Sequence, residues 1–174
     1  MKELLDGMND EEREIVIYGL RQLPMYIVTY ISILFIMLLM HMVWQGILYS
    51  IVYFSIRRYS GGFHAATRIK CYIVSIMLVI LAMFCVKYIN LSCLLSKLAC
   101  IIFCIGVFLI SPVDGVNKIL DNIEKKVYKK RACIIAMFWT SFAIIVPYEI
   151  TASIVSVALF QILLMCILGL KFKN

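Results

Sequence analysis

Charged residues are missing from long parts of this sequence. Neither Met25–Ile56 nor Ile150–Leu170 contains a Lys, Arg, Asp or Glu, and only two lysines interrupt the stretch from Cys71 to Val113. Apolar residues make up 64% of the 174 residues and the mean hydropathy is +0.99, whereas an ordinary soluble domain is about 45–50% apolar. This composition excludes an ordinary soluble protein. It predicts an all-α membrane protein, because an uncharged apolar stretch of about 18 or more residues can cross the bilayer as a helix.

The apolar stretches predict a polytopic transmembrane bundle of about five or six spans. Four spans are expected near residues 71–90, 94–112, 132–148 and 150–170. Met25–Ile56 would make a helix of roughly 48 Å, too long for one untilted crossing and too short for two full ones. A hairpin that breaks near His41–Gly46 gives six spans and a single tilted helix gives five. We favour the hairpin, because His41 and Gln45 are polar and suit a turn, although the interior of a bundle could also satisfy them.

Clustered metal ligands are also missing. The seven cysteines form no CxxC pair and no clustered Cys/His ligand set. We therefore expect no metal, no cofactor and no disulfide framework. Six cysteines lie in or beside apolar spans, where a cysteine acts as a small buried hydrophobe: Cys85, Cys93, Cys100, Cys104, Cys133 and Cys166.

The excess of positive charge lies at the ends of the apolar spans. The 17 Lys and Arg residues against 10 Asp and Glu give a formal charge of +7. Their placement is typical of membrane orientation rather than of a nucleic-acid-binding patch. By the positive-inside rule, Arg57–Lys70, Lys118–Arg131, Lys171 and Lys173 belong in the cytoplasm. We therefore expect one membrane domain over residues 1–174, in contact with lipid and not with nucleic acid.

Three parts of this domain are more polar than the spans. Residues 1–23 carry an acidic cluster followed by spaced apolar residues, which predicts a short amphipathic helix, although an ordinary soluble lead-in fits equally well. Residues 57–71 and 113–131 are expected to be cytoplasmic loops. The second of these is basic and could attract an acidic peptide or anionic lipid headgroups, or simply anchor the topology.

The first polar loop carries the residues from which chemistry can be predicted. The Gly61–Gly62 pair permits backbone conformations that other residues cannot reach, so the chain can turn tightly just before His64. Histidine acts as a general base near neutral pH, and cysteine is a nucleophile as its thiolate. His64 and Cys71 are therefore candidate catalytic residues for attack on a peptide carbonyl. A plain loop between two spans is the simpler interpretation.

Other residues of this loop are candidates for supporting roles. Backbone N–H groups around Gly61 and Gly62 could stabilise an oxyanion. Four basic side chains could stabilise a thiolate or contact a substrate, although topology anchoring explains them equally well: Arg57, Arg58, Arg68 and Lys70. No third catalytic residue can be assigned.

Geometry sets a condition on the pair of His64 and Cys71. In one straight helix the two side chains would share a face but stand about 10.5 Å apart along the axis. A nucleophile and its base must come within about 3 Å. The chain must therefore bend between these two residues.

The motifs of this chain resemble those of the AgrB (accessory gene regulator B) family of bacterial quorum-sensing peptidases. The resemblance covers almost the whole chain and includes the long apolar run that precedes the polar loop. It is carried by Arg57-Arg58-x-x-Gly61-Gly62-x-His64-Ala65 with Cys71, by Ser111-Pro112-Val113-Asp114 with Asn117-Lys118, and by the lysine-rich Lys125–Arg131. Ile119 stands where the family often has a proline, which affects the turn in the second loop but not the catalytic pair.

The resemblance implies a cysteine endopeptidase of the bacterial cell membrane that removes the C-terminal tail of an AgrD-like precursor peptide on the cytoplasmic side. Cys71 would form a thioester with the peptide, and His64 would be the base. A cysteine or serine of the substrate would then attack the thioester and close a thiolactone or lactone ring. We also expect a homodimer. The alternatives are a non-catalytic membrane scaffold and a small transporter, neither of which needs this pair.

Overall fold

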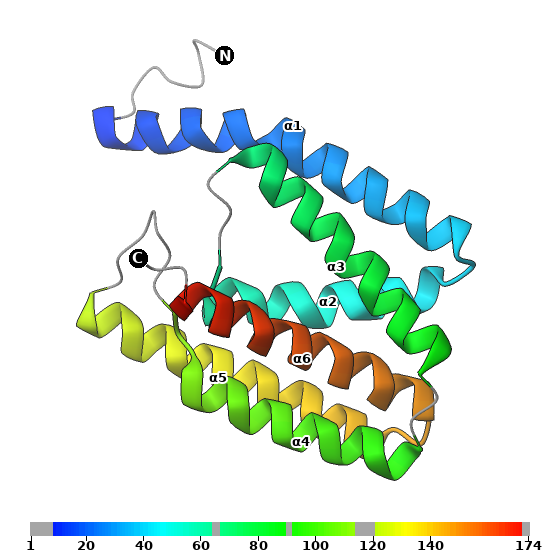
Figure 1. Ribbon diagram of the computed structural model, residues 1–174. Helices are drawn as coiled ribbons and strands as arrows, with labels where there is room; N and C mark the ends of the chain where they lie inside the picture. The colour runs from blue at the N-terminus through cyan, green and yellow to red at the C-terminus, as the bar shows by residue number, and fades with distance from the viewer. Residues whose placement is uncertain (1–8, 64–66, 90–91, 114–120, 172–174) are drawn as a thin grey trace.

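The computed structural model describes residues 9–63, 67–89, 92–113 and 121–171, and all regular secondary structure in these ranges is helical (Figure 1). Successive helices run in opposite directions along a bundle (Figure 1). They are α1 (Asp10–Leu39), α2 (Val43–Ser60), α3 (Arg68–Tyr88), α4 (Cys93–Ile110), α5 (Asn122–Ile145) and α6 (Glu149–Lys171). The predicted all-α bundle is confirmed.

The long apolar run breaks into the two helices of a hairpin, as predicted. α1 ends at Leu39 and α2 begins at Val43. His41 lies in the break with a positive φ of 55°, and the N–H of Met42 closes the turn by donating to the carbonyl of Met37 at 2.9 Å. Gln45, which we expected near the turn, already belongs to α2.

The N-terminal segment is helical from Asp10, but it does not form a separate short helix. It continues through Pro24 into the apolar part of α1. A proline inside a helix removes one backbone hydrogen bond, whereas ending the helix there would expose the unsatisfied groups of two helix ends. Beside an apolar environment the continuous helix is therefore the cheaper solution.

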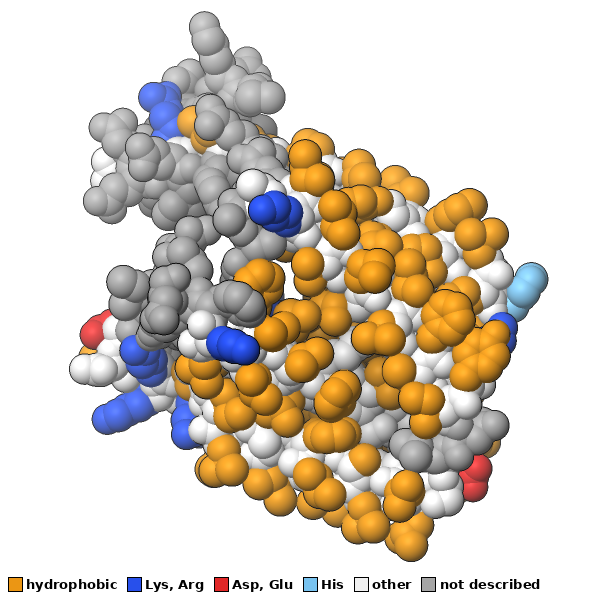
Figure 2. Space-filling view, viewed as in Figure 1, with side chains coloured by type: hydrophobic (Ala, Val, Ile, Leu, Met, Phe, Trp, Pro, Cys, Tyr) orange, Lys and Arg blue, Asp and Glu red, His pale blue; other side chains and the backbone are white. Residues whose placement is uncertain are grey.

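Three helices of the described chain are long and apolar enough to cross a membrane: Ile69–Tyr88, Cys93–Ile110 and Glu149–Lys171. Leu23–Leu39 of α1 is a shorter apolar segment. α2 and α5 combine apolar stretches with basic residues at one end. Many large apolar side chains are exposed on the outside of the bundle, and they cover most of the face seen in Figure 2. Such a surface suits lipid rather than water, so the protein is a helical membrane protein.

α6 is the central helix and packs against α2, α3, α4 and α5. Gln161 of α6 joins three helices, because its amide accepts a hydrogen bond from the Tyr49 hydroxyl of α2 and donates one to the Leu78 carbonyl of α3 at 3.0 Å. Ser153 of α6 pairs with Ser96 of α4 at 3.2 Å. Hydrogen bonds between helices add to the close packing that holds membrane bundles together.

Two further polar contacts hold the outer helices. Ser32 of α1 pairs with the Tyr72 hydroxyl of α3 at 2.9 Å, and Trp139 of α5 donates its indole N–H to Ser55 of α2 at 3.0 Å. α1 packs mainly against α3 and only slightly against α2. It is therefore the most peripheral helix of the bundle.

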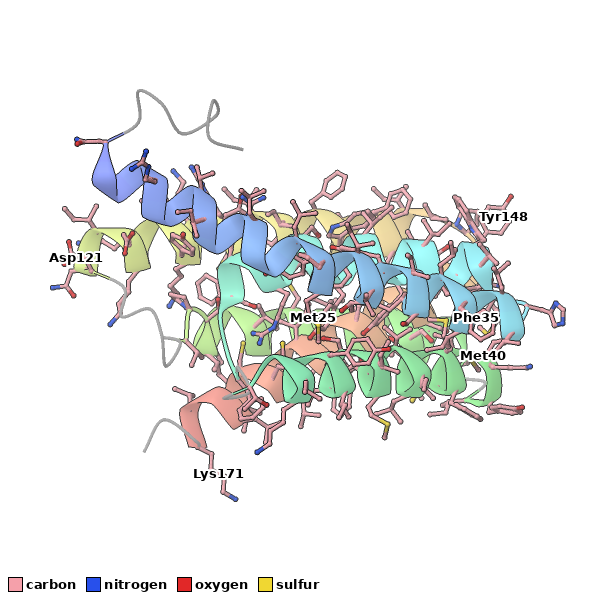
Figure 3. All side chains as sticks on the ribbon, turned by 90° about the horizontal axis from the view of Figure 1, so that it is seen from above. Met25, Phe35, Met40, Asp121, Tyr148 and Lys171 are labelled. Atoms are coloured by element: carbon pink, nitrogen blue, oxygen red, sulfur yellow. The ribbon has the colours of Figure 1, made fainter. Side chains whose placement is uncertain are left out.

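The basic residues of the described chain gather mostly at one end of the bundle. Asp121 and Lys171 lie at this end in Figure 3, and Met40 and Tyr148 lie at the opposite end. The end of the bundle that holds Asp121 and Lys171 is called the basic end below. Its Lys and Arg residues include Arg57, Arg58, Lys70, Lys125, Lys126, Lys129, Lys130, Arg131 and Lys171.

The two segments expected to be loops are largely helical where they are described. Residues 57–60 form the last turn of α2, and residues 68–71 begin α3. Residues 122–131 belong to α5, which starts with a capping box between Asp121 and Glu124. That box satisfies backbone N–H groups at the start of the helix, so α5 begins well before its apolar part. The loops are therefore shorter than predicted, because their charged residues belong to the ends of α2, α3 and α5.

The Gln161 network predicts a measurable loss of stability when it is broken. Gln161→Leu leaves the Tyr49 hydroxyl buried without a partner, which should lower the free energy of unfolding by about 1–3 kcal/mol. Unfolding in detergent by a denaturant titration measures this change. Adding Tyr49→Phe should restore part of the loss, since two apolar partners leave no orphaned group. A double variant that loses the full sum of the two single changes would contradict the network.

Candidate functional site

A glycine pair ends α2 and turns the chain toward α6. Gly61 has φ 67° and Gly62 has φ 110°, both in the region that glycine reaches most readily. Gly61 forms an isolated parallel bridge with Val113, and the Val113 N–H donates to the Ser60 carbonyl at 3.0 Å. The segment after α4 therefore holds the end of α2 in place.

Phe63, the residue before His64, is held on both sides of its backbone. Its N–H donates to the Met165 carbonyl of α6 at 2.9 Å. Its carbonyl accepts a hydrogen bond from Nη2 of Arg57 at 2.6 Å. Arg57 belongs to the last turn of α2 and is half-buried. The chain therefore enters the predicted catalytic segment from a fixed position.

Close packing explains why these positions are glycines. A Cβ on Gly61 would lie 2.0 Å from the Val113 carbonyl oxygen, and a Cβ on Gly62 would lie 2.7 Å from the Met165 carbonyl oxygen. Across the contact, a Cβ on Gly169 of α6 would lie 2.7 Å from the Phe63 nitrogen. Main chain lies against main chain here, which only residues without a side chain allow. The oxyanion role predicted for Gly61 and Gly62 stays a prediction.

Cys71 lies in the first turn of α3 with its side chain exposed. Thr67 caps this helix: its side chain accepts a hydrogen bond from the Lys70 N–H at 3.3 Å, and its carbonyl accepts one from the Cys71 N–H at 3.0 Å. All seven cysteines lie in described residues, and Cys71 alone among them is exposed. The other six are buried or half-buried, as their predicted packing role requires.

The structure meets the bend condition on the predicted pair. α2 stops at Ser60, Thr67 has an extended backbone, and α3 starts at Arg68, so no single helix runs from before His64 through Cys71. His64 itself lies outside the described residues. The pairing of His64 with Cys71 therefore stays a prediction.

The four basic candidates differ in where they lie. Arg57 is half-buried and contacts the Phe63 carbonyl, whereas Arg58 and Lys70 are exposed. Arg68 is the first residue of α3, and its side chain is not described. Within the described ranges, no group of three or more His, Cys, Asp or Glu side chains is arranged to hold a metal ion.

Sequence reasoning did not predict which distant parts of the chain hold the glycine loop in place. Val113 follows α4, while Met165 and Gly169 belong to α6, about a hundred residues beyond the loop in the sequence. Tyr53 was also missed, although its hydroxyl lies near the Arg57 guanidinium. Only its spacing from Arg57 could have predicted this contact, because residues 53 and 57 share a face of α2.

The contact between Gly169 and the loop predicts a contrast between two glycine variants. Gly169→Ala places a methyl group against backbone that cannot move aside without displacing Phe63. Gly106→Ala in α4 meets the flexible end of the Leu163 side chain at 2.8 Å. Both changes raise helix propensity equally, so only the neighbour differs. We expect a lower thermal midpoint in detergent for Gly169→Ala than for Gly106→Ala, and equal midpoints would contradict this packing.

Comparison with known proteins places this chain in a family. A family model described as accessory gene regulator B matches residues 1–168. An AgrB-like protein of Listeria monocytogenes serotype 4a is 27% identical over 160 residues, which cover 89% of this chain and 78% of the relative. An AgrB-like protein of Clostridium perfringens strain SM101 is 27% identical over 171 residues, covering 90% and 78%. No solved structure matches.

The family match extends over the helical bundle and the glycine loop together. Such coverage leaves only the last six residues of the chain outside the match. The chain therefore belongs to the accessory gene regulator B family of membrane proteins, which act in the peptide processing of quorum sensing.

Proposed function

We propose that the protein is a membrane cysteine endopeptidase that removes the C-terminal tail of an AgrD-like precursor peptide. Cys71 is the nucleophile and His64 is the general base. The single observation that carries the proposal is the exposure of Cys71 in the first turn of α3, a helix separate from α2. Family membership supports the peptide as substrate.

The position of Cys71 suits a nucleophile. A helix N-terminus carries partial positive charge, which favours an anion in the first turn, and Cys71 occupies that turn of α3. The exposed sulfur is open to a peptide. The remaining cysteines are buried or half-buried, so each is less accessible to a substrate than Cys71 is.

The chemistry follows from these two residues. His64 takes the thiol proton while the Cys71 sulfur attacks the scissile carbonyl carbon. The carbon–nitrogen bond then breaks, His64 returns the proton to the leaving amine, and the C-terminal tail departs. The rest of the peptide stays on Cys71 as a thioester. One amide bond is broken, one thioester is formed, and no external oxidant or reductant is needed.

Release of the peptide from Cys71 completes the proposed reaction. A cysteine thiol or serine hydroxyl within the peptide attacks the thioester carbonyl and closes a thiolactone or lactone ring. The Cys71 sulfur leaves and regains a proton. Exchange of one thioester for another is nearly neutral in energy, so a thiolactone can form without ATP.

The basic end of the bundle is proposed to face the cytoplasm of a bacterial cell. Lys and Arg accumulate on the cytoplasmic side of membrane proteins. The ends of α2, α4 and α6 and the starts of α3 and α5 meet at this end (Figure 1). The site around Cys71 therefore meets its peptide in the cytoplasm. The homodimer expected from the sequence stays a prediction.

The catalytic proposal predicts that Cys71→Ala and His64→Ala each abolish cleavage of the cognate precursor. The two residues act as a unit, so removal of either should cost nearly as much as removal of both. A gel assay of tagged precursor co-expressed with each variant measures cleavage, with an immunoblot for the membrane protein. Replacing the six other cysteines together is the matched control and should leave most activity. Cleavage by Cys71→Ala at the wild-type level would leave the scaffold or transporter alternatives.

The orientation predicts opposite labelling of two introduced cysteines. In a chain without native cysteines, Asn122→Cys lies at the basic end and Tyr148→Cys at the other, and both positions are exposed. A membrane-impermeant maleimide added to intact cells should modify residue 148 and spare residue 122 until the cells are opened. Labelling of residue 122 in intact cells would place the basic end outside the cell and contradict the proposed cytoplasmic site.

A further inference from the structure

Arg57 is the charged residue most closely tied to the segment before His64. Its Nη2 donates to the Phe63 carbonyl at 2.6 Å. Its Nη1 is buried and has no hydrogen-bond partner among the described residues, and a Cβ built on Gly62 would lie 2.6 Å from it. The guanidinium is therefore enclosed by the turn that it holds. Arg58, the next residue, is exposed.

Tyr53 stands behind Arg57 on the same face of α2. The two residues are one turn apart, the spacing at which helix side chains meet. Tyr53 is 7% exposed, and its ring stacks on Tyr49. Its hydroxyl lies near the Arg57 guanidinium. The packed Tyr53 ring therefore limits the room for the Arg57 side chain on this face of α2, and the Phe63 carbonyl accepts a hydrogen bond from the guanidinium.

We infer that Arg57, supported by Tyr53, is a positioning residue that sets the place of His64 relative to Cys71. This role rests on the proposed function of that pair. The Phe63 carbonyl belongs to the peptide bond that joins Phe63 to His64. A shift of this carbonyl therefore also shifts the backbone nitrogen of His64. The Met165 contact holds only the N–H side of Phe63. Arg57 holds the carbonyl of Phe63, which is the end of this residue that is linked to His64.

This positioning role depends on the planar shape of the guanidinium and not only on its charge. Arginine presents five N–H donors in a rigid planar fork, so one nitrogen can donate to the Phe63 carbonyl while another lies against Gly62. Lysine keeps the charge but concentrates it on one flexible ammonium. If Arg57 acted only by charge, on a thiolate or on an acidic peptide, lysine would serve nearly as well. Arg57→Lys therefore separates the two roles.

The first test measures cleavage of the precursor by purified, reconstituted variants. Arg57→Lys should lower kcat about 10- to 100-fold with KM little changed, since a small misplacement of a catalytic group costs this much. Tyr53→Phe should lower kcat by a smaller factor. Arg13→Lys and Tyr26→Phe make the same exchanges at exposed positions of α1 and should match wild type. A wild-type kcat for Arg57→Lys, or a change in KM alone, would overturn the positioning role.

The second test reads the position of the turn without using activity. Phe63→Cys in a chain that lacks the native cysteines reports access to residue 63 through its rate of reaction with a maleimide. Adding Arg57→Lys should raise this rate several-fold, and adding Arg13→Lys should leave it unchanged. An unchanged rate with Arg57→Lys would overturn the inference even if kcat fell. Because no cleavage is needed, this result is independent of the proposed peptidase activity, which Cys71→Ala tests separately.

Discussion

The hydrogen bond from the Phe63 N–H to the Met165 carbonyl joins the predicted catalytic segment to the central helix. Around it, Gly61, Gly62 and Gly169 let main chain approach main chain more closely than any side chain would allow. α6 can serve as the anchor because four other helices pack around it. Its position in the middle of the bundle thus fixes the turn at the basic end.

Cys71 depends on the same arrangement from the other side of the turn. α3 packs on α6, and Gln161 of α6 holds the Leu78 carbonyl of α3 at 3.0 Å. α6 therefore locates both the chain that leads to His64 and the helix that begins just before Cys71. In the proposed dyad, His64 and Cys71 would then need little reorganisation on binding a peptide, because a rigid scaffold favours catalysis.

Much of this fold could be predicted from the sequence because hydrophobic length has a direct meaning in a membrane. The apolar run from Met25 to Ile56 and its break near His41 followed from that reasoning. The prediction of a loop at Asn122–Arg131 was wrong, because this basic segment is helical. A capped helix tolerates charged residues where it lies outside the apolar part of the membrane. At the site, Gly61, Gly62 and Arg57 were found from local sequence. Their partners Met165 and Gly169 were not, because contacts between distant helices leave no local pattern.

The Cys71 sulfur is proposed to carry the peptide as a thioester, and the mass of the enzyme trapped during turnover measures this intermediate directly. Wild-type protein quenched in acid with its precursor should carry an adduct on the fragment that contains Cys71. Hydroxylamine at neutral pH should remove the adduct, and Cys71→Ala should never form it. A cleaved precursor with no adduct on wild-type enzyme, or an adduct on another cysteine, would rule out Cys71 as the residue that carries the peptide.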